Sequence, residues 1–387
     1  MSASSIYMDY AATTPADPRV IEAMNKCCGI GGAFANSASM HKLGRQAADV
    51  VNHARGQLGY LLNTSPDRLI WTSGATESDN LAIRGAAYAR AHRGKHLVTM
   101  LTEHKAVIDT FKALEKDGFE TTWLAPRKDG MLDIDDLAEV LRVDTQLVSI
   151  MHVNNETGVV QDICAISELC RGNDVLFHCD AAQSVGKLEV DLQEMQVDLL
   201  SLTAHKFYGP QGIGALYIAD RPRGGIFPIT FGGGQEKRLR PGTLPVHQIA
   251  GLGCAAEIAS AELEENIQHV QSMRDRLWAG ISDIPGLLRN GDSDSSYAGI
   301  LNVSVSDVEG ESLILGMDPV CVASGSACNS TNNDPSHVLM ALGCSSIEAQ
   351  AAIRFSFGRL TTLADIDFAI KQYRTTVEHL RSIAPAS

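Results

Sequence analysis

Residues 197–214 read VDLLSLTAHKFYGPQGIG, and this stretch decides the fold. An apolar run of the strand type leads to Lys206, and a turn rich in glycine and proline follows it. A lysine at the mouth of a strand can lose its proton through desolvation and attack an aldehyde. Most lysines are solvated surface residues, so the side chains that accompany Lys206 elsewhere in the chain decide between the two interpretations.

Length, charge and cysteine usage narrow the class of protein. The chain has 387 residues, of which 44% are apolar, enough for a large core and two domains. A formal net charge of −14 argues against direct nucleic-acid binding. No signal peptide and no membrane-spanning apolar run is visible. The nine cysteines show no Cys-x-x-Cys pair and no zinc-like spacing, so we expect no metal, and free thiols in a reducing cytoplasm.

From about residue 66, short apolar runs alternate with amphipathic stretches. We expect strands at 68–72, 95–101, 146–153, 175–179, 197–202 and 215–218, and helices at 76–91, 104–116 and 163–170. Strands that alternate with helices predict an α/β fold with a mostly parallel sheet covered on both faces.

The pattern changes after Gly234. We expect one long helix at 245–270, then short strands, and a C-terminal helix at 363–382. This change predicts a second, smaller domain, against which the N-terminal segment packs.

Small and polar residues follow the predicted strands, at the edge where open α/β sheets bind ligands. Residues 72–77 read TSGATE and open a helix, so free backbone N–H groups form a site for phosphate. Other strands are followed by His104, by residues 154–158 (NNETG) and by Asp180. An imidazole can stack on a cofactor ring or move a proton, and a carboxylate can pair with a protonated pyridine nitrogen.

Each of these groups alone also fits an ordinary helix cap, a turn or a solvated carboxylate. Thr203 and His205, which flank Lys206, can bind phosphate as well. Five successive strand ends all carry groups that could bind a cofactor. Helix caps, turns and solvated carboxylates do not readily explain all five together. The sequence therefore predicts a pyridoxal-phosphate site with Lys206 as its covalent anchor.

Cys328 differs from the other cysteines, which lie in apolar patterns or lack a reactive setting. Residues 323–335 read ASGSACNSTNNDP, and these small, turn-forming residues predict an exposed loop. An accessible thiolate is the nucleophilic form of cysteine.

Arg354 can bind a carboxylate through two parallel hydrogen bonds. Alternatively, Cys328 is a loop cysteine without a role in the reaction, and Arg354 forms a surface ion pair.

In combination these motifs resemble cysteine desulfurases of the NifS/IscS type, in the class V aminotransferase family of pyridoxal-phosphate enzymes. The resemblance runs from residues 7–15 (YMDYAATTP) to residues 354–359 (RFSFGR). It implies the transferase fold type I, in which a large domain (15–255) holds a mostly parallel sheet of the seven-stranded type. A smaller α+β domain (1–14 and 256–387) would carry the cysteine loop.

The resemblance also implies a role for each matching residue. Lys206, Cys328 and His104 would be catalytic: Lys206 forms the Schiff base, Cys328 attacks sulfur, and His104 stacks on the ring and acts as acid or base. Arg354 and Asn155 would bind the substrate. The residues expected to hold the cofactor are Ala75, Thr76, His104, Asn155, Asp180, Gln183, Thr203, His205, Lys206 and Thr243. Among these, Asp180 would pair with the pyridine nitrogen, Gln183 would bond the phenolic oxygen, and Thr243 would reach the phosphate from the other subunit of a homodimer.

The implied reaction converts L-cysteine to L-alanine and leaves a persulfide on Cys328 for an acceptor protein. Iron–sulfur cluster assembly, tRNA thiolation and DNA phosphorothioation are the family's precedents. Because the sequence stops at Ser387, without the docking tail of housekeeping members, we expect a dedicated acceptor. Residues 36–39 (NSAS) and Pro241 depart from the family pattern, which weakens a substrate role for Asn36 and alters the expected contact of Thr243.

Three alternatives stay open. The first is another enzyme of the same fold, such as an aminotransferase or a selenocysteine lyase, and an aminotransferase would not need Cys328. A nucleotide-binding oxidoreductase is suggested by GPQGIG at 209–214, but a strand-like stretch rather than a helix follows it. A non-catalytic protein that kept the fold would have no need of Lys206, Asp180 and His104 together.

Overall fold

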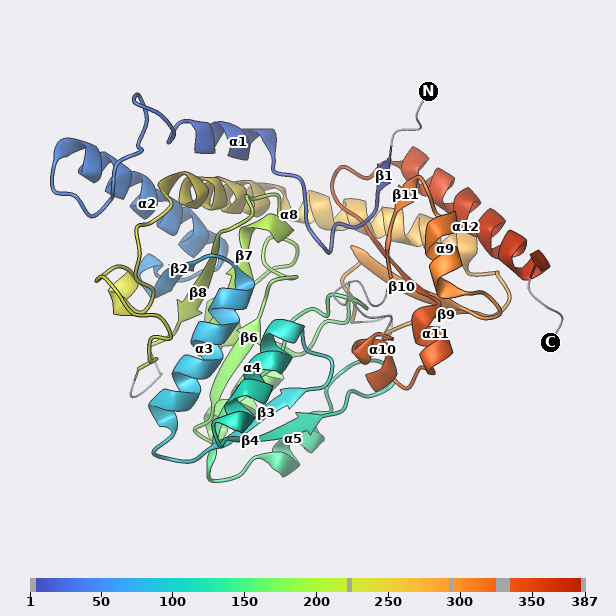
Figure 1. The fold of residues 1–387 in the computed structure, drawn as a ribbon, viewed down its shortest axis with the longest axis horizontal. Coiled ribbons are helices and arrows are strands. Elements are labelled where there is room, and N and C mark those ends of the chain that lie inside the picture. Colours follow the sequence, from blue (N-terminus) through green and yellow to red (C-terminus); the bar gives the residue numbers. More distant parts are fainter. Residues whose placement is uncertain (1–4, 221–224, 292–294, 325–334, 384–387) are drawn as a thin grey trace.

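The computed structural model describes residues 5–220, 225–291, 295–324 and 335–383. Figure 1 shows two regions joined along one edge by the long helix α8. One is built on a large sheet, which we call the large-sheet region. The other, which we call the second region, contains β9 to β13, α9 to α12 and the N-terminal strand β1.

The large sheet has seven strands in the order β2-β8-β7-β6-β5-β3-β4. Within it, β8 runs antiparallel to both neighbours and the other pairings are parallel. The strands are β2 (Leu69–Thr72), β3 (His96–Met100), β4 (Glu120–Leu124), β5 (Thr145–Ser149), β6 (Leu176–Asp180), β7 (Leu199–Thr203) and β8 (Gly214–Ile218). The predicted mostly parallel sheet is confirmed.

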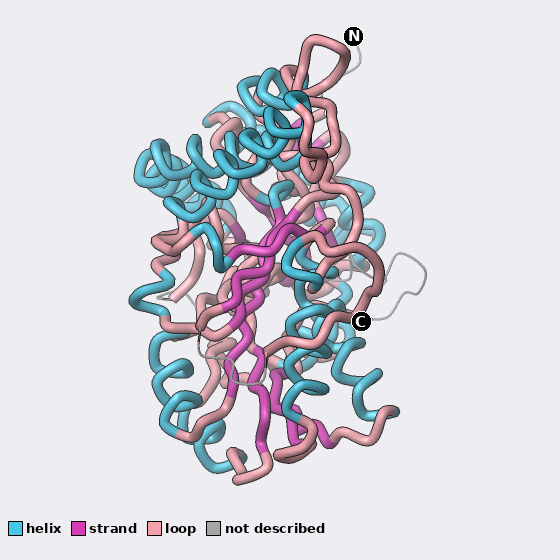
Figure 2. The backbone as a smooth tube through the Cα atoms, turned by 90° about the vertical axis from the view of Figure 1, so that its left-hand side faces the viewer, coloured by secondary structure: helices cyan, strands magenta, loops and turns pink. Residues whose placement is uncertain are grey.

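Alternate residues of the central strands divide between two hydrophobic cores, one on each face of the sheet. Val98 and Phe177 pack with α2, α6 and α8, whereas Leu97 and Leu176 pack with α3 and α4. Figure 2 shows helices on both sides of the strands. The helices of this region are α1 (Pro18–Asn25), α2 (Lys42–Leu61), α3 (Ala75–Arg90), α4 (Lys105–Lys116), α5 (Ile134–Val140), α6 (Ile163–Gly172) and α7 (Leu192–Met195), with short 3-10 helices at η1 (Pro66–Arg68), η2 (Ala204–Lys206) and η3 (Glu236–Arg238).

Several elements were not predicted. The edge strand β4 reads ETTWL and is only partly buried, so it lacks the apolar run that marks the central strands. Helices α1, α2 and α5 were also missed. The alternation of apolar runs and amphipathic stretches on which the prediction rests begins near residue 66, after α1 and α2.

Helix α8 (Val246–Ile281) spans 36 residues and extends beyond the predicted end at residue 270. Its first half buries Ile249 and Leu252 in the core of the large-sheet region. Its second half buries Met273 and Leu277 in the core of the second region. The predicted domain division at residues 255 and 256 falls inside this helix and stays a prediction. None of the helices in the described residues is both long and apolar enough to cross a membrane.

The second region holds a four-stranded antiparallel sheet in the order β12-β13-β10-β9. The N-terminal segment packs on this region, because β1 pairs with β11 and Asp9 bridges to Ser356. The strands are β1 (Ile6–Tyr7), β9 (Leu287–Arg289), β10 (Ile300–Val305), β11 (Val320–Cys321), β12 (Ala323–Ser324) and β13 (Ala352–Ser356), and the helices are α9 (Gly310–Gly316), α10 (His337–Ala341), α11 (Ser346–Gln350) and α12 (Leu363–Ile383).

Candidate active site

A cavity of about 580 Å³ lies where the strand ends of the large sheet meet the N-terminal segment and β13. Of the predicted site residues, those that line it are Ala75, Thr76, His104, Asn155, Asp180, Gln183, Thr203, His205, Lys206 and Arg354. The cavity therefore gathers residues that are spread over most of the chain. Another hollow of about 520 Å³, around Arg127 and Asp162, contains none of them.

Two predicted site residues remain: Thr243 is not in this lining, and Cys328 is not described. Thr243 is exposed in the single chain, and Arg240, close to it in sequence, pairs with Glu77 of α3 at 2.9 Å. Cys328 lies within residues 325–334, outside the described residues. The chain enters that segment from β12, whose Ala323 is paired with Arg354, and it leaves the segment just before Ser336. The Ser336 hydroxyl donates to Glu156 Oε2 at 2.5 Å.

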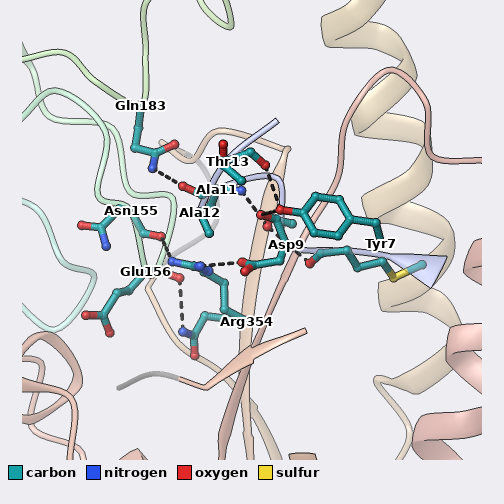
Figure 3. A network of polar contacts seen from close by, with 12 residues as sticks. Tyr7, Asp9, Ala11, Ala12, Thr13, Asn155, Glu156, Gln183 and Arg354 are labelled. Carbon is teal, nitrogen blue, oxygen red and sulfur yellow. Dashed lines mark hydrogen bonds and ion pairs between the residues drawn. The ribbon is translucent and has the colours of Figure 1, made fainter. Parts of the chain in front are cut away.

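Lys206 ends the short helix η2, which follows β7 directly. Its Nζ donates to the carbonyl oxygens of Ala11 at 2.5 Å and Ala12 at 2.7 Å. The next residue back, His205, is bonded through Nδ1 to Thr13 Oγ1 at 3.0 Å. Figure 3 shows this N-terminal stretch, residues 11–13, close to Gln183 and Arg354. The N-terminal segment thus forms one wall of the cavity.

The loop between β2 and α3 forms a cradle for an anion. Gly74 has a φ of 155°, and α3 begins at Ala75, so the first backbone N–H groups of α3 have no acceptor within the helix. The loop sits tightly against β8, because a Cβ on Gly214 would lie 2.4 Å from Leu202 O and 2.7 Å from Gly74 Cα. Gly209 and Gly214 of the GPQGIG stretch therefore serve close packing. Because Gly214 opens a strand rather than a helix, the nucleotide-binding alternative is wrong.

Asp180 ends β6 and is 6% exposed. Its Oδ1 accepts a hydrogen bond from the backbone N–H of Ala182 at 2.9 Å. Burial raises the pKa of Asp180, while the nearby His104 and Lys206 oppose that rise. Burial also holds the carboxyls of Asp79 and Glu103 at a pKa well above the usual range, and the charge of Asp180 adds to this. Of these three carboxyls, Asp180 is the one that lines the cavity, where the charges of His104 and Lys206 favour its ionised form.

His104 both caps α4 and lines the cavity. Its Nδ1 accepts from the backbone N–H of Ala106 at 3.1 Å, so a neutral ring carries its proton on Nε2. Burial is the main cause that lowers the pKa of His104. The ordinary interpretation as a helix cap and the cofactor interpretation are therefore compatible.

Arg354 lies on β13 and is 4% exposed. Its Nη2 pairs with Asp9 Oδ1 at 2.7 Å, and its Nη1 donates to the backbone oxygen of Asn155 at 2.8 Å (Figure 3). Its Nε is buried without a hydrogen-bond partner in the described part of the chain. A buried guanidinium with an unused donor favours a further acceptor, such as a carboxylate. Sequence reasoning missed Asp9, although it lies in the YMDYAATTP motif.

The comparisons with known proteins place this geometry in a family. The aminotransferase class-V family model matches residues 6–368. The chain therefore belongs to the class V aminotransferase family, whose members use pyridoxal phosphate.

Curated relatives carry one shared name. The chain is 51% identical over 381 residues to "Cysteine desulfurase IscS" of Pectobacterium atrosepticum, covering 98% of this chain and 94% of the relative. It is 52% identical, with the same coverage, to the protein of the same name from Vibrio cholerae.

Solved structures agree with the fold. A NifS-like protein matches with a TM-score of 0.90 and 32% identity, over 97% of this chain and 100% of the other. DndA from Streptomyces lividans matches with a TM-score of 0.78 and 39% identity, over 91% of this chain and 99% of that one.

The described side chains fit pyridoxal phosphate. The start of α3 offers backbone donors for a phosphate, Asp180 offers an anion for a ring nitrogen, and Lys206 offers a primary amine. Arg354 lines the same cavity, and its guanidinium suits the carboxylate of an amino-acid substrate.

Proposed function

We propose that this protein is a pyridoxal-phosphate-dependent cysteine desulfurase, which removes sulfur from L-cysteine and releases L-alanine. The observation that carries the proposal is the single cavity lined together by Lys206, Asp180, His104 and Arg354. An amine for the cofactor, an anion for its ring and a cation for the substrate carboxylate share this space. The name shared by the curated relatives supports the same reaction.

When bound, pyridoxal phosphate supplies an electron-withdrawing ring that stabilises negative charge on the attached substrate carbon. The Asp180 carboxylate would hold a proton on the pyridine nitrogen. Arg354 orients the substrate by binding the substrate's carboxylate. His104 presents Nε2–H, because Nδ1 is used by the helix cap. The carbonyls of Ala11 and Ala12 give the Lys206 amine two acceptors whenever that amine is free.

Cys328 is the proposed sulfur acceptor within the enzyme. Its thiolate attacks the substrate sulfur, the carbon–sulfur bond breaks, and the sulfur remains on Cys328 as a persulfide while the carbon takes a proton to give alanine. Support comes from the two flanks of segment 325–334. Ala323 pairs with Arg354 on one side, and Ser336 bonds Glu156, next to Asn155, on the other.

We further propose a homodimer in which Thr243 reaches the phosphate of the other subunit. Its exposure in the single chain supports this assignment, as does the pair between Arg240 and Glu77.

The persulfide passes to an acceptor protein in iron–sulfur assembly, tRNA thiolation or DNA phosphorothioation. The cysteines of the described residues are free thiols, which supports work in the cytoplasm. Direct nucleic-acid binding by this chain is not part of the proposal, because its formal net charge is −14, and neither is membrane binding.

A single-turnover reaction with L-cysteine, followed by alanine analysis and intact mass, tests the proposal. We expect alanine together with a mass gain of one sulfur atom, and the loss of both in Cys328→Ala. Cys321→Ala is the matched control, because Cys321 is an exposed free thiol on the neighbouring strand β11. Alanine formation that persists in Cys328→Ala would instead favour a lyase, and cofactor binding without alanine would favour an aminotransferase.

A further inference from the structure

A second lysine, Lys187, lies beside the proposed cofactor site. Its Nζ donates to Oε1 of Gln183 at 2.7 Å, across the turn that follows β6. Gln183 is 4% exposed and lines the cavity. Nothing in the proposed function so far makes use of Lys187.

The surroundings of Lys187 are unusual for a lysine. Its Nζ lies 5.7 Å from the ring centroid of Tyr297, and no carboxylate pairs with it within the described residues. Burial, together with the positive charges of Lys206 and Arg354, holds the pKa of Lys187 well below its usual range. A surface lysine normally keeps its ammonium group in water. Here the amine is held where its clearest polar partner is the Gln183 amide.

The bonds to Lys187 and to the Ala11 carbonyl together fix which end of the Gln183 amide faces the cavity. A glutamine amide has an acceptor oxygen and a donor nitrogen that can exchange places by rotation. Because Oε1 is held by Lys187, Nε2 is directed the other way, where it donates to the backbone oxygen of Ala11 at 2.8 Å. That oxygen also accepts from Lys206 Nζ at 2.5 Å. A continuous set of hydrogen bonds therefore links Lys187, Gln183, Ala11 and Lys206.

We propose that Lys187 is a positioning residue: it locks the Gln183 amide so that a donor N–H, rather than an acceptor oxygen, faces the cofactor's phenolic oxygen. This deepens the proposed function and rests on it. Nε2 carries two hydrogens, so it can bond Ala11 and still donate into the cavity. A donor here stabilises negative charge on the phenolic oxygen, whereas an acceptor would repel it.

The test is a pH titration of the visible absorbance of the holoenzyme, which reports protonation of the nitrogen that joins the cofactor to Lys206. In Lys187→Met the amide keeps its bond to Ala11 but loses the one that holds Oε1, and a displaced donor should raise the midpoint by about half a pH unit or more. Lys187→Arg keeps a donor and should restore a midpoint near wild type. Other charged groups near this nitrogen are unchanged in both variants: Asp180, His104, His205 and Arg354.

A double-mutant cycle shows whether the effect passes through Gln183. Lys187→Met should add nothing to the midpoint shift of Gln183→Ala, because the residue through which it acts is already gone. Lys371→Met, at an exposed position of α12, is the matched control and should titrate like wild type. Thermal unfolding of every variant is measured alongside.

An unchanged midpoint in Lys187→Met, with or without lower thermal stability, would overturn the proposal. Lys187 would then only stabilise the turn that follows β6. Additive shifts in the double variant would also overturn it. Failure of the proposed function looks different, because wild type itself would then show no cofactor absorbance or would form no alanine from cysteine.

Discussion

The Asp9 carboxylate lies 2.7 Å from Nη2 of Arg354, although 345 positions of sequence separate the two residues. The side chain of Arg354 is 5% exposed, so its positive charge needs a nearby partner. Asp9 meets that need and fixes the plane of the guanidinium, while the backbone oxygen of Asn155 holds Nη1. The N-terminal segment therefore prepares the site that we assign to the substrate carboxylate.

Replacing Arg354 with lysine should raise KM for cysteine by about tenfold or more with a smaller change in kcat. Lysine keeps the charge but cannot give two parallel hydrogen bonds to a carboxylate. Steady-state alanine formation measures both constants. Arg276→Lys, in an exposed pair with Asp367, is the control and should leave both unchanged. An unaltered KM in Arg354→Lys would remove Arg354 from the substrate site.

Gly214→Ala should cost about 1–3 kcal/mol of stability and weaken cofactor binding, because the new Cβ would collide with Leu202 O and with Gly74 in the phosphate cradle. The dissociation constant of pyridoxal phosphate for the cofactor-free protein measures this effect. Gly172→Ala is the control, since a Cβ there meets nothing within 4 Å. Equal affinities in the two variants would mean that the cradle does not hold the phosphate.

Glu156 should make the protein less stable as the pH rises from about 4.5 to about 7. Burial raises its pKa from 4.5 to about 7, against the opposing effects of Ser336 and Arg354. Between these values the folded chain holds a proton that the unfolded chain has lost, so the free energy of unfolding falls as pH increases. Glu156→Gln mimics the protonated form and should flatten this part of the profile.

Denaturant unfolding of both proteins at pH 5 and pH 7 measures this difference. The exposed Glu139→Gln variant should follow the wild-type profile. Parallel profiles for wild type and Glu156→Gln would show that Glu156 is ionised in the folded protein at both pH values.

Mixing two inactive variants tests the proposed dimer. Lys206→Ala should lose cofactor attachment, and Thr243→Ala should bind the phosphate weakly. In a mixed dimer, the site that keeps Lys206 would receive an intact Thr243 from the other subunit, so activity should reappear after subunit exchange. If Thr243 served its own subunit, mixing would restore nothing.

The sequence predicted the parts of the fold in which the local pattern and the tertiary environment agree. Strands β6 and β7 are buried on both faces, so their apolar runs were visible. Strand β4 lies at the sheet edge, where threonines are tolerated, and it was missed. The end of α8 was placed too early, although Met273, Leu277 and Ile281 continue its apolar face at intervals of four.

The cavity lining could be predicted for residues at strand ends, because topology alone brings those ends together. Asp9 and Lys187 could not be found in this way. Asp9 reaches the site through long-range packing of the N-terminal segment, and Lys187 follows a turn whose direction the sequence does not specify. A lysine between Val185 and Leu188, in an otherwise apolar turn, was the available signal. The thiol of Cys328 lies outside the described residues, so its role rests on the resemblance.

Helix α8 belongs to both hydrophobic cores without a break. A continuous helix is stiff, so the sheet whose strand β7 leads to Lys206 and the sheet that carries Arg354 cannot swing apart as they would on a flexible linker. Under the proposed function, this stiffness would keep the Lys206 amine and the Arg354 guanidinium at a nearly constant separation. A substrate would then have to match that separation with its own amino and carboxylate groups.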